Sequence, residues 1–552
     1  MDYITGDNKH HDGKVRVRER TRVLRYGDAP QEENVYYLHS SAPRPFNVSD
    51  RIFAWICLFL GYIFCCSLPI KDYPIIGFGF VLLLFSITSF FLIKHKAVFR
   101  PIPVAAAVSA VVLSFALVFT GNTLLWVFAY AYSLVVYCYF LFSASGNRAR
   151  RGFTDYIAVD FIEALFVAPF FGFTKLFKAM FVGLSKRKRQ KIVKSITNSA
   201  VALIPISIFF VLLSYDWKAV NEYGNIPEVA ALDVIYRVLS IGFAIPIAMY
   251  IFGLYSLTLE RKRRHSVVKG WLSKMSEEMK IMPAKGLLFV AVTVLSAYVA
   301  YVIVKWEEIF AGFTDYLPID ETVSELARAG LLEATAISVI NIIVILTMVL
   351  LVRRYSIKSN LPFKILTVVY CLYSIFLISV SSMKMLRCIR ELGLSRNRIY
   401  GLWTMVLLAV VCLIIIVKQF VPRFKALATI MSVAIVLFGA LAFSNVDLQV
   451  SNHNINGYIN GTYDTVDVDS ASLLGDDAVP DLVRLYEFLD EKVENNTANE
   501  EETKMFYNLY VTLNDRQAQY EENKHNIFAY NVPRARAVKA LQQIDLSKET
   551  SK

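Results

Sequence analysis

The sequence predicts an all-α protein, a polytopic membrane bundle of about eleven transmembrane helices followed by a small soluble helical C-terminal module. Three observations predict this class. The 552 residues are 56% hydrophobic and only 19% charged, with a mean hydropathy of +0.46, which is too apolar for a soluble protein. The apolar residues fall in blocks of about 20, each long enough to cross the hydrocarbon layer as a helix. The part after Phe443 differs from the rest by being polar and acidic.

Residues 1–50 are expected to form a basic cytoplasmic tail that is partly disordered. Arg16, Arg18, Arg20 and Arg22 alternate with other residues, so an extended chain would present one basic face. Anionic headgroups of the inner leaflet are the expected partner, and these four arginines are the expected lipid-binding residues. Nucleic acid is not expected, because the segment has no recognisable fold and few aromatic residues to stack on bases.

The bundle is expected over residues 51–443, and positive charge in its short loops predicts its orientation. Lys and Arg gather after the second, fourth, sixth and eighth blocks, whereas the loop Thr120–Thr123 is uncharged. The N-terminus is therefore expected in the cytoplasm and the uncharged loop outside. The expected spans are 52–68, 75–93, 101–120, 123–142, 195–215, 233–258, 285–304, 331–352, 362–382, 401–417 and 425–443.

Residues 156–181 are apolar enough to cross but are not expected to do so. The segment contains Asp160, Glu163, Lys175 and Lys178, and Pro169 interrupts it. Both of its flanks are strongly basic, so a crossing would place one basic flank outside. We expect an amphipathic helix on the inner surface or a re-entrant segment.

A second anomaly is the basic segment 383–398, which the count of spans places outside. It carries Lys384, Arg387, Arg390, Arg396 and Arg398. Either the ninth block does not cross, or these cations are held outside by something stronger than the topology bias. We favour the second alternative, because Lys418, Arg423 and Lys425 then stay cytoplasmic and the C-terminus is extracytoplasmic.

Residues 444–552 predict a separate acidic helical module. It has 10 Lys and Arg against 19 Asp and Glu, a net charge of −9, so the rest of the chain carries +21. Residues 481–493 and 503–520 have apolar residues at helical spacing. Such a module could also receive a protein partner.

Four segments together resemble a bacterial membrane family catalogued as domain of unknown function 4173. The resemblance implies a bacterial cytoplasmic membrane and the same architecture, and it carries no agreed activity. The segments are Ser324–Glu333, Gly393–Arg398, Asn445–Asp447 with Asn452–Asn454, Asp467 and Gly475–Pro480, and Tyr530–Ala537.

The candidate substrate-binding residues are charged or polar and lie on the outer side or near it. Lys384, Arg387 and Arg390 at three-residue spacing form a cationic stripe if helical, opposite an acidic loop at 306–333. The two could dock on each other or line a cavity for an anion. Glu333 and Asn341 share a face of the eighth span, either as a helix contact or as an ion path. The full set is Arg328, Glu333, Asn341, Arg387, Arg390 and Arg398.

The sequence lacks the local motifs of phosphate-binding loops, zinc proteases and serine hydrolases, so no cofactor and no metal are expected. A permease-like or transport-associated protein for a small or lipidic anion is the first hypothesis. A membrane sensor or scaffold with an external module is the alternative. An enzyme acting on a lipid-linked substrate, using Glu325, Glu333 and Arg398, is the third.

Overall fold

The computed structural model describes residues 45–67, 73–95, 99–144, 154–183, 228–259, 283–313, 322–351, 361–524 and 526–544, with a few isolated residues besides. All regular structure in these ranges is helical. Nine of the described helices are long and apolar enough to cross a membrane, or ten if the bent pair at Ala426–Ala442 and Val446–Ile459 counts as one span. The prediction of an all-α polytopic bundle is confirmed. The expected span 195–215 and the arginines of the N-terminal tail lie outside the described residues.

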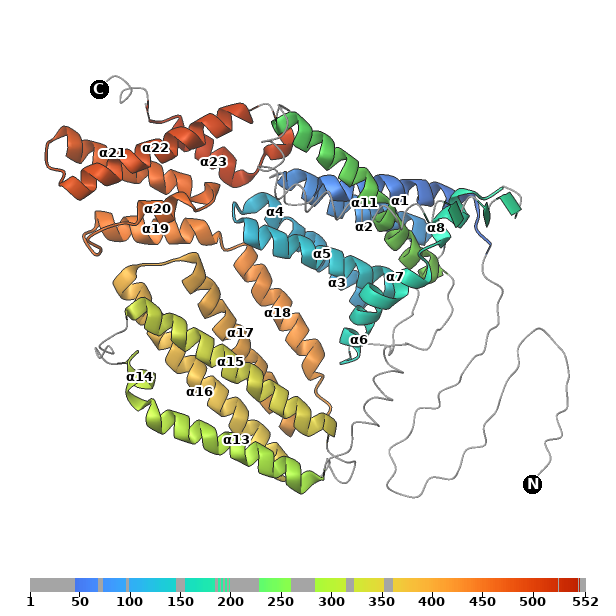
Figure 1. Cartoon of the computed structure of the whole chain (residues 1–552), viewed down its shortest axis with the longest axis horizontal. Coiled ribbons are helices and arrows are strands. Elements are labelled where there is room, and N and C mark those ends of the chain that lie inside the picture. The colour runs from blue at the N-terminus through green and yellow to red at the C-terminus, as the bar shows by residue number, and fades with distance from the viewer. Residues whose placement is uncertain are drawn as a thin grey trace.

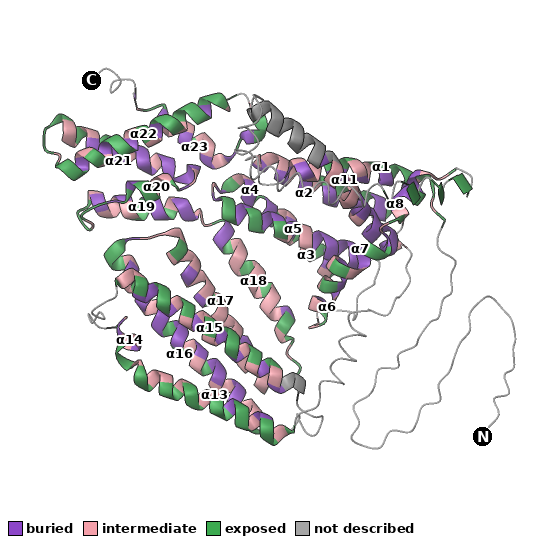
Figure 2. Cartoon of the chain, in the orientation of Figure 1, coloured by how far each residue is buried: buried purple, intermediate pink, exposed green. Residues whose placement is uncertain are grey.

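A first group of helices forms the most buried part of the molecule (Figures 1 and 2). It consists of α1 (Val48–Cys66), α2 (Pro74–Lys94), α3 (Pro101–Ser114), α4 (Ala116–Phe119), α5 (Thr123–Ala144) and α11 (Glu228–Leu259). In its apolar window α11 is 67% buried, against 11% for α13 (Ala284–Val304) of the second group. The first group therefore supplies the core, and α13 presents most of its surface to its surroundings.

Small residues let α1 and α11 approach closely. A Cβ on Gly61 of α1 would lie 2.3 Å from the carbonyl oxygen of Ala244 in α11, so a larger residue has no room there. Further along the same pair, the rings of Phe53 and Tyr255 pack 4.1 Å apart. Asn47 begins α1 with a capping box to Asp50, which also lies 3.5 Å from His95 at the end of α2.

Residues 156–181 do not form one continuous helix. They form α6 (Ile157–Ile162), a π-helical turn (Glu163–Val167), α7 (Ala168–Phe171) and α8 (Lys175–Met180). Asp160 and Glu163 are buried, and a Cβ on Gly172 would lie 2.4 Å from the carbonyl oxygen of Gly253 in α11. The segment thus packs into the first group, as expected of a re-entrant segment more than of a helix lying on the surface.

The second group comprises α13, α14 (Trp306–Phe310), α15 (Val323–Leu351), α16 (Leu361–Leu392) and α17 (Arg396–Phe420). Helix α16 packs against both α15 and α17. Helix α18 (Ala426–Ala442) lies between α17 and the first group, where it contacts α5 (Figure 1). The expected span 362–382 ends too early, because α16 continues to Leu392 and carries most of the basic segment, and only residues 393–395 turn.

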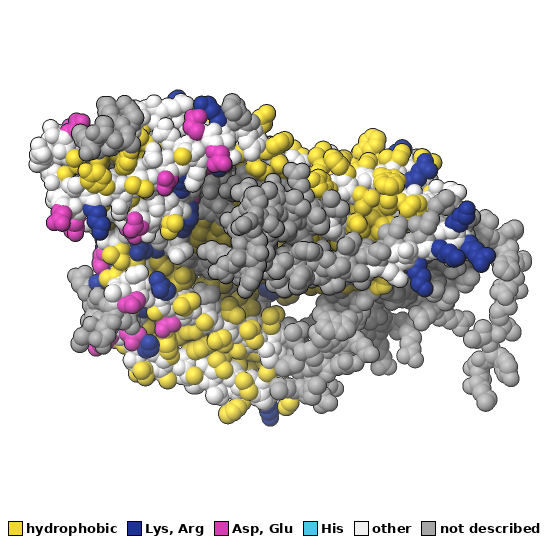
Figure 3. Space-filling view, turned by 45° about the horizontal axis from the view of Figure 1, so that its top comes forward, with side chains coloured by type: hydrophobic (Ala, Val, Ile, Leu, Met, Phe, Trp, Pro, Cys, Tyr) yellow, Lys and Arg dark blue, Asp and Glu magenta, His cyan; other side chains and the backbone are white. Residues whose placement is uncertain are grey.

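The C-terminal module contains α19 (Val446–Ile459), α20 (Val468–Ser472), the 3-10 helix η2 (Asp476–Ala478), α21 (Val479–Glu494), α22 (Glu500–Glu522), the 3-10 helix η3 (Ile527–Ala529) and α23 (Val532–Leu541). Leu485, Phe506, Leu509 and Leu513 form its buried core. A capping box of Asn499 and Glu502 begins α22. On the face shown in Figure 3, acidic side chains gather on the module, whereas the spans show mostly hydrophobic ones.

Contacts across the molecule define two faces at opposite ends of the spans. At the junction face, the loop at Gly121 and Asn122, the turn 393–395 and the module meet, since Gly121 donates to Asp477 and Asn454 bonds to Leu394. At the basic face, Asp155 accepts from the amide of Leu427 at 3.0 Å and lies 3.7 Å from Lys418. The module thus lies on the side of the uncharged loop, away from Lys418 and Lys425.

This arrangement predicts which residues an impermeant reagent reaches. Leu473, 76% exposed on the module, belongs to the junction face, and the exposed Arg423 belongs to the basic face. Because basic loops stay inside, Leu473→Cys should react with a membrane-impermeant maleimide in intact cells and Arg423→Cys only after lysis. The unsubstituted protein, labelled in parallel, controls for its seven native cysteines. The reverse pattern would refute the orientation.

Candidate functional site

The turn between α16 and α17 is built to hold the module. Gly393 has a φ of +74°, a conformation that side chains other than glycine rarely adopt, and Ser395 caps α17. Arg398 donates through Nη1 to the carbonyl of Leu392 at 3.0 Å, which gives a hydrogen-bond donor to a carbonyl in the last turn of α16. The amide of Asn454 on α19 accepts from Leu394 N at 2.7 Å and donates to Leu394 O at 2.8 Å. The module is therefore hydrogen-bonded to the backbone of this turn.

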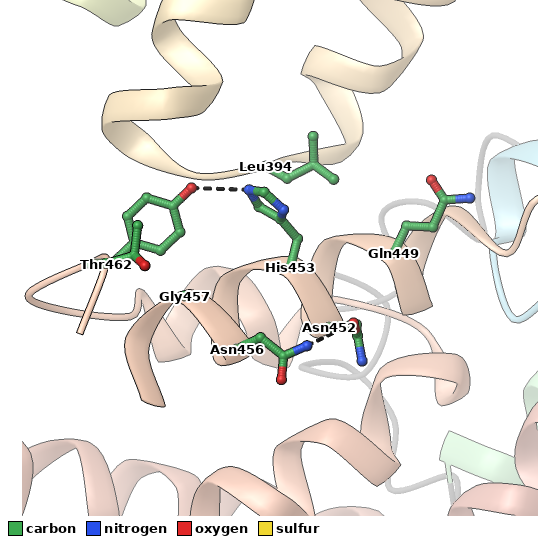
Figure 4. A pocket seen from close by; sticks show the side chains of 8 residues that line it. Leu394, Gln449, Asn452, His453, Asn456, Gly457 and Thr462 are labelled. Atoms are coloured by element: carbon green, nitrogen blue, oxygen red, sulfur yellow. Dashed lines mark hydrogen bonds between the residues drawn. The ribbon is translucent and has the colours of Figure 1, made fainter. Parts of the chain in front are cut away.

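A pocket of about 480 Å³ opens beside this contact (Figure 4). Helix α19 contributes one wall, the turn contributes Leu394, and the loop after α19 contributes Tyr463. The lining side chains carry amide, imidazole, hydroxyl and phenol groups and no carboxylate, ammonium or guanidinium. The lining residues are Leu394, Gln449, Asn452, His453, Asn456, Gly457, Thr462 and Tyr463.

Hydrogen bonds fix the pocket's aromatic edge. The Tyr463 hydroxyl donates to the carbonyl of Ile389 at 3.3 Å, and it lies 3.0 Å from Nε2 of His453 (Figure 4). With the hydroxyl proton given to Ile389, Nε2–H of His453 is the donor to Tyr463. The ring of Tyr463 lies over Gly457, where a Cβ would come within 2.3 Å of it. His453 thus points across the pocket toward the α16 end.

The opposite wall is tied to the module's interior. Asn456 donates to Asn452 at 2.9 Å and accepts from Arg484 at 2.8 Å. Arg484 in turn lies 3.3 Å from Asp481, which also accepts from Ser451. The charges nearest the pocket are therefore neutralised behind its amide wall, so the wall offers neutral donors and acceptors.

Next to the pocket, the fully buried carboxylate of Asp447 forms an ion pair. Arg396, at the start of α17, donates to both of its carboxylate oxygens, from Nε at 2.6 Å and from Nη2 at 2.5 Å. Asn122 donates to it at 2.9 Å and the amide of Gly475 at 2.8 Å. One carboxylate thereby joins the first group of helices, the second group and the module.

Asp476 and Asp477 complete the junction on the module's side. Asp476 accepts from Arg516, Arg534 and Tyr520, and burial beside this carboxylate raises the pKa of Tyr520. Asp477 accepts from the amide of Gly121 at 2.7 Å. Burial, and then the neighbouring carboxylates of Asp447 and Asp476, raise the pKa of Asp477 to about 6, although the Gly121 N–H and the positive charge of Arg536 oppose the shift.

The sequence-based candidates lie outside this pocket. Arg387 donates to the carbonyl of Ala311 at 2.8 Å and to Glu391 at 2.8 Å, so among the described residues it meets the 306–333 region through the backbone of Ala311. Lys384 is buried against Gly312 and Gly330. Arg390 and Arg328 are exposed.

Two further candidates lie on α15. Glu333 lies 3.7 Å from Lys305. Asn341 is buried and donates to Ser374 of α16 at 2.8 Å. Both therefore contact neighbouring helices. Their part in substrate binding, like that of Arg328, Arg387, Arg390 and Arg398, stays a prediction.

Sequence reasoning missed Asp447, Asp477, His453 and Tyr463 as functional candidates. Asn445–Asp447, Asn452–Asn454 and Gly475–Pro480 carried only a family resemblance. The available signal was Arg396, a cation on the side where topology disfavours it. Such a residue needs an acidic partner, and the first acid after the last span is Asp447.

Comparison with known proteins gives a family without an assigned activity. The model described as "Domain of unknown function (DUF4153)" matches residues 107–485, more than half of the chain. The family is therefore DUF4153 and not the family 4173 that the four segments resembled. No curated protein and no solved structure matches the chain.

Removing the charge of Asp447 should loosen the whole junction. Asp447→Asn leaves Arg396 without its counter-charge, which costs about 3–5 kcal/mol for a fully buried pair and less here, because Arg396 is 31% exposed. We expect a lower unfolding temperature in detergent and faster proteolysis of the module. Asp469→Asn, exposed in the same module, should change neither. Adding Arg396→Gln to Asp447→Asn should restore part of the loss, and additive losses would contradict the pairing.

Asp477 should give the junction a dependence on pH. Its pKa of about 6 exceeds an unfolded value of about 3.9, so folding favours the protonated carboxyl. This contribution is complete below pH ~4 and is lost as the pH rises through about 6. Asp477→Asn keeps an acceptor for Gly121 and cannot ionise. The unfolding temperature of the native protein should therefore fall relative to that of Asp477→Asn between these values, and parallel profiles would contradict the assignment.

Proposed function

We propose that this chain, which belongs to the DUF4153 family, is an integral membrane protein that senses a small neutral solute through its C-terminal module. One observation carries the proposal: the neutral polar pocket lies where the module meets the turn between α16 and α17. A solute bound there touches both the module and the transmembrane part. Its binding energy therefore favours one arrangement of the two over others.

The pocket's chemistry supports a neutral, hydrogen-bonding ligand such as a sugar or a peptide amide. Gln449 and Asn452 present amides, and His453 presents an imidazole. These groups match hydroxyl and amide partners without a compensating charge. This favours a neutral solute over the anion expected from the cationic stripe.

The helices on either side of the turn support transmission of the signal. Asn454 holds the backbone of Leu394, and α16 runs from this turn over 32 residues to the other end of the bundle. At the far end of α17, Lys418 pairs with Asp155 and so contacts the start of the broken segment 156–181. A shift of the turn can thus move helices whose other ends lie at the basic face.

Transport is the second candidate, and the broken segment is the observation that favours it. Asp160 of α6 and Glu163 of the π-helical turn are buried, and α7 and α8 of the same segment pack against α11. Discontinuous helices with buried acids are typical of transporters. In that case the pocket at the junction face would be an entry site. Solute counterflow into proteoliposomes, lost in Asp160→Asn, would be the sign of transport.

Thermal unfolding of the full chain in nanodiscs tests the sensing proposal. Glucose, sucrose, glycerol and N-acetylglycinamide are the probes, and a ligand at 100 times its Kd stabilises by about 2.7 kcal/mol. At least one should raise the unfolding temperature. The shift should vanish in Gln449→Ala with His453→Ala, both exposed, and persist in Gln517→Ala, an exposed glutamine on α22. No shift with any probe, or an equal shift in all variants, would overturn the proposal.

A further inference from the structure

We propose that the C-terminal module rests on the bilayer through an apolar foot formed by Ile527, Phe528 and Tyr530. Its partner is the boundary between the headgroups and acyl chains of anionic lipids beside α2. These side chains are 77%, 54% and 51% exposed. Three adjacent large apolar side chains exposed on a soluble, acidic module require an explanation.

The foot is a turn whose backbone is held by hydrogen bonds. Asn526 caps η3 by accepting from the amide of Phe528 at 3.1 Å, and Ala529 is buried beneath it. Arg534 donates to the carbonyl of Ala529 at 2.9 Å. The backbone is thus held from the inside while the three large side chains point away from the module's core.

Its place fits the surface of a bilayer. η3 packs beside α2, and α23 beside α4. Gly77, near the start of α2, lies within van der Waals reach of Leu117 in α4 and of Trp126, so this end of α2 belongs to the junction face. Phe115 and Phe119, next to it, are 42% and 43% exposed. The foot therefore continues the apolar flank of the spans at the level where they leave the hydrocarbon layer, and aromatic residues favour this level.

The charge around the foot fits anionic headgroups. The stretch 523–544 contains no Asp or Glu, although the module as a whole has a net charge of −9. It contains Lys524, Arg534, Arg536 and Lys539. Arg536 and Lys539 are exposed, whereas Lys524 pairs with Glu521 at 3.0 Å and Arg534 with Asp476 at 3.1 Å. A basic border around an apolar tip is the composition of segments that lie in a membrane interface.

Depth-dependent quenching tests the foot in the full chain. An environment-sensitive fluorophore is attached to Ile527→Cys in liposomes of phosphatidylcholine and phosphatidylglycerol. Val511→Cys is the matched control, since it is 56% exposed on α22, which packs on α20, α21 and α23 of the module. The unsubstituted protein, labelled in parallel, measures reaction of the native cysteines.

Lipids with a spin label near the headgroup should quench the fluorophore at 527 several-fold more than the fluorophore at 511. Aqueous iodide should quench the fluorophore at 511 more than the one at 527. Phe528→Glu should raise iodide quenching at 527. Equal iodide quenching at both positions would overturn the proposal, as the foot would then lie in water. Protection of 527 from both quenchers would also overturn it, since a second copy or another protein would then cover the foot. None of these outcomes bears on the pocket, whose test is independent.

Discussion

The buried ion pair between Asp447 and Arg396 is the interaction on which the rest of the structure depends. Asp447 is fully buried and also accepts from Asn122 and Gly475, so one carboxylate holds the loop before α5, the start of α17 and the module together. A buried carboxylate is costly unless all its acceptor sites are used. Any movement of one unit relative to the others would weaken these bonds to the buried carboxylate, so the ion pair favours the arrangement seen here over others.

The same constraint explains how the junction face, which the charges of the short loops predict to be extracytoplasmic, holds cations. Three of the cations there are used by the fold: Arg396 pairs with Asp447, Arg387 donates to the carbonyl of Ala311, and Arg398 donates to the carbonyl of Leu392 at the end of α16. The guanidinium group of each of these three residues thus meets oxygen atoms of the fold. Local pairing energy here outweighs the statistical preference for positive charge inside.

The pocket lies between two charged centres but is itself neutral. Arg484 and Asp481 neutralise each other behind it, and Arg396 and Asp447 do so beside it. Asn456 accepts from Arg484 and Asn452 donates to Asp481, so the pocket meets this ion pair through neutral amide groups. Because its walls belong to two units that the ion pair holds together, a ligand in the pocket and the state of the junction affect the same equilibrium.

The sequence by itself determined the membrane class, the described spans, the breaks in 156–181 and the helical module, because hydrophobic length and helical spacing are local properties of the chain. For the cationic stripe it left docking on the 306–333 region and an anion cavity open, and in the structure Arg387 meets that region at Ala311 while Arg390 is exposed. Only the tertiary structure decided where α16 ends, which acid pairs with Arg396, and that Leu394 lines the same pocket as His453 and Tyr463. These features depend on residues distant along the chain, and their pairing is fixed by packing and desolvation once the helices have assembled.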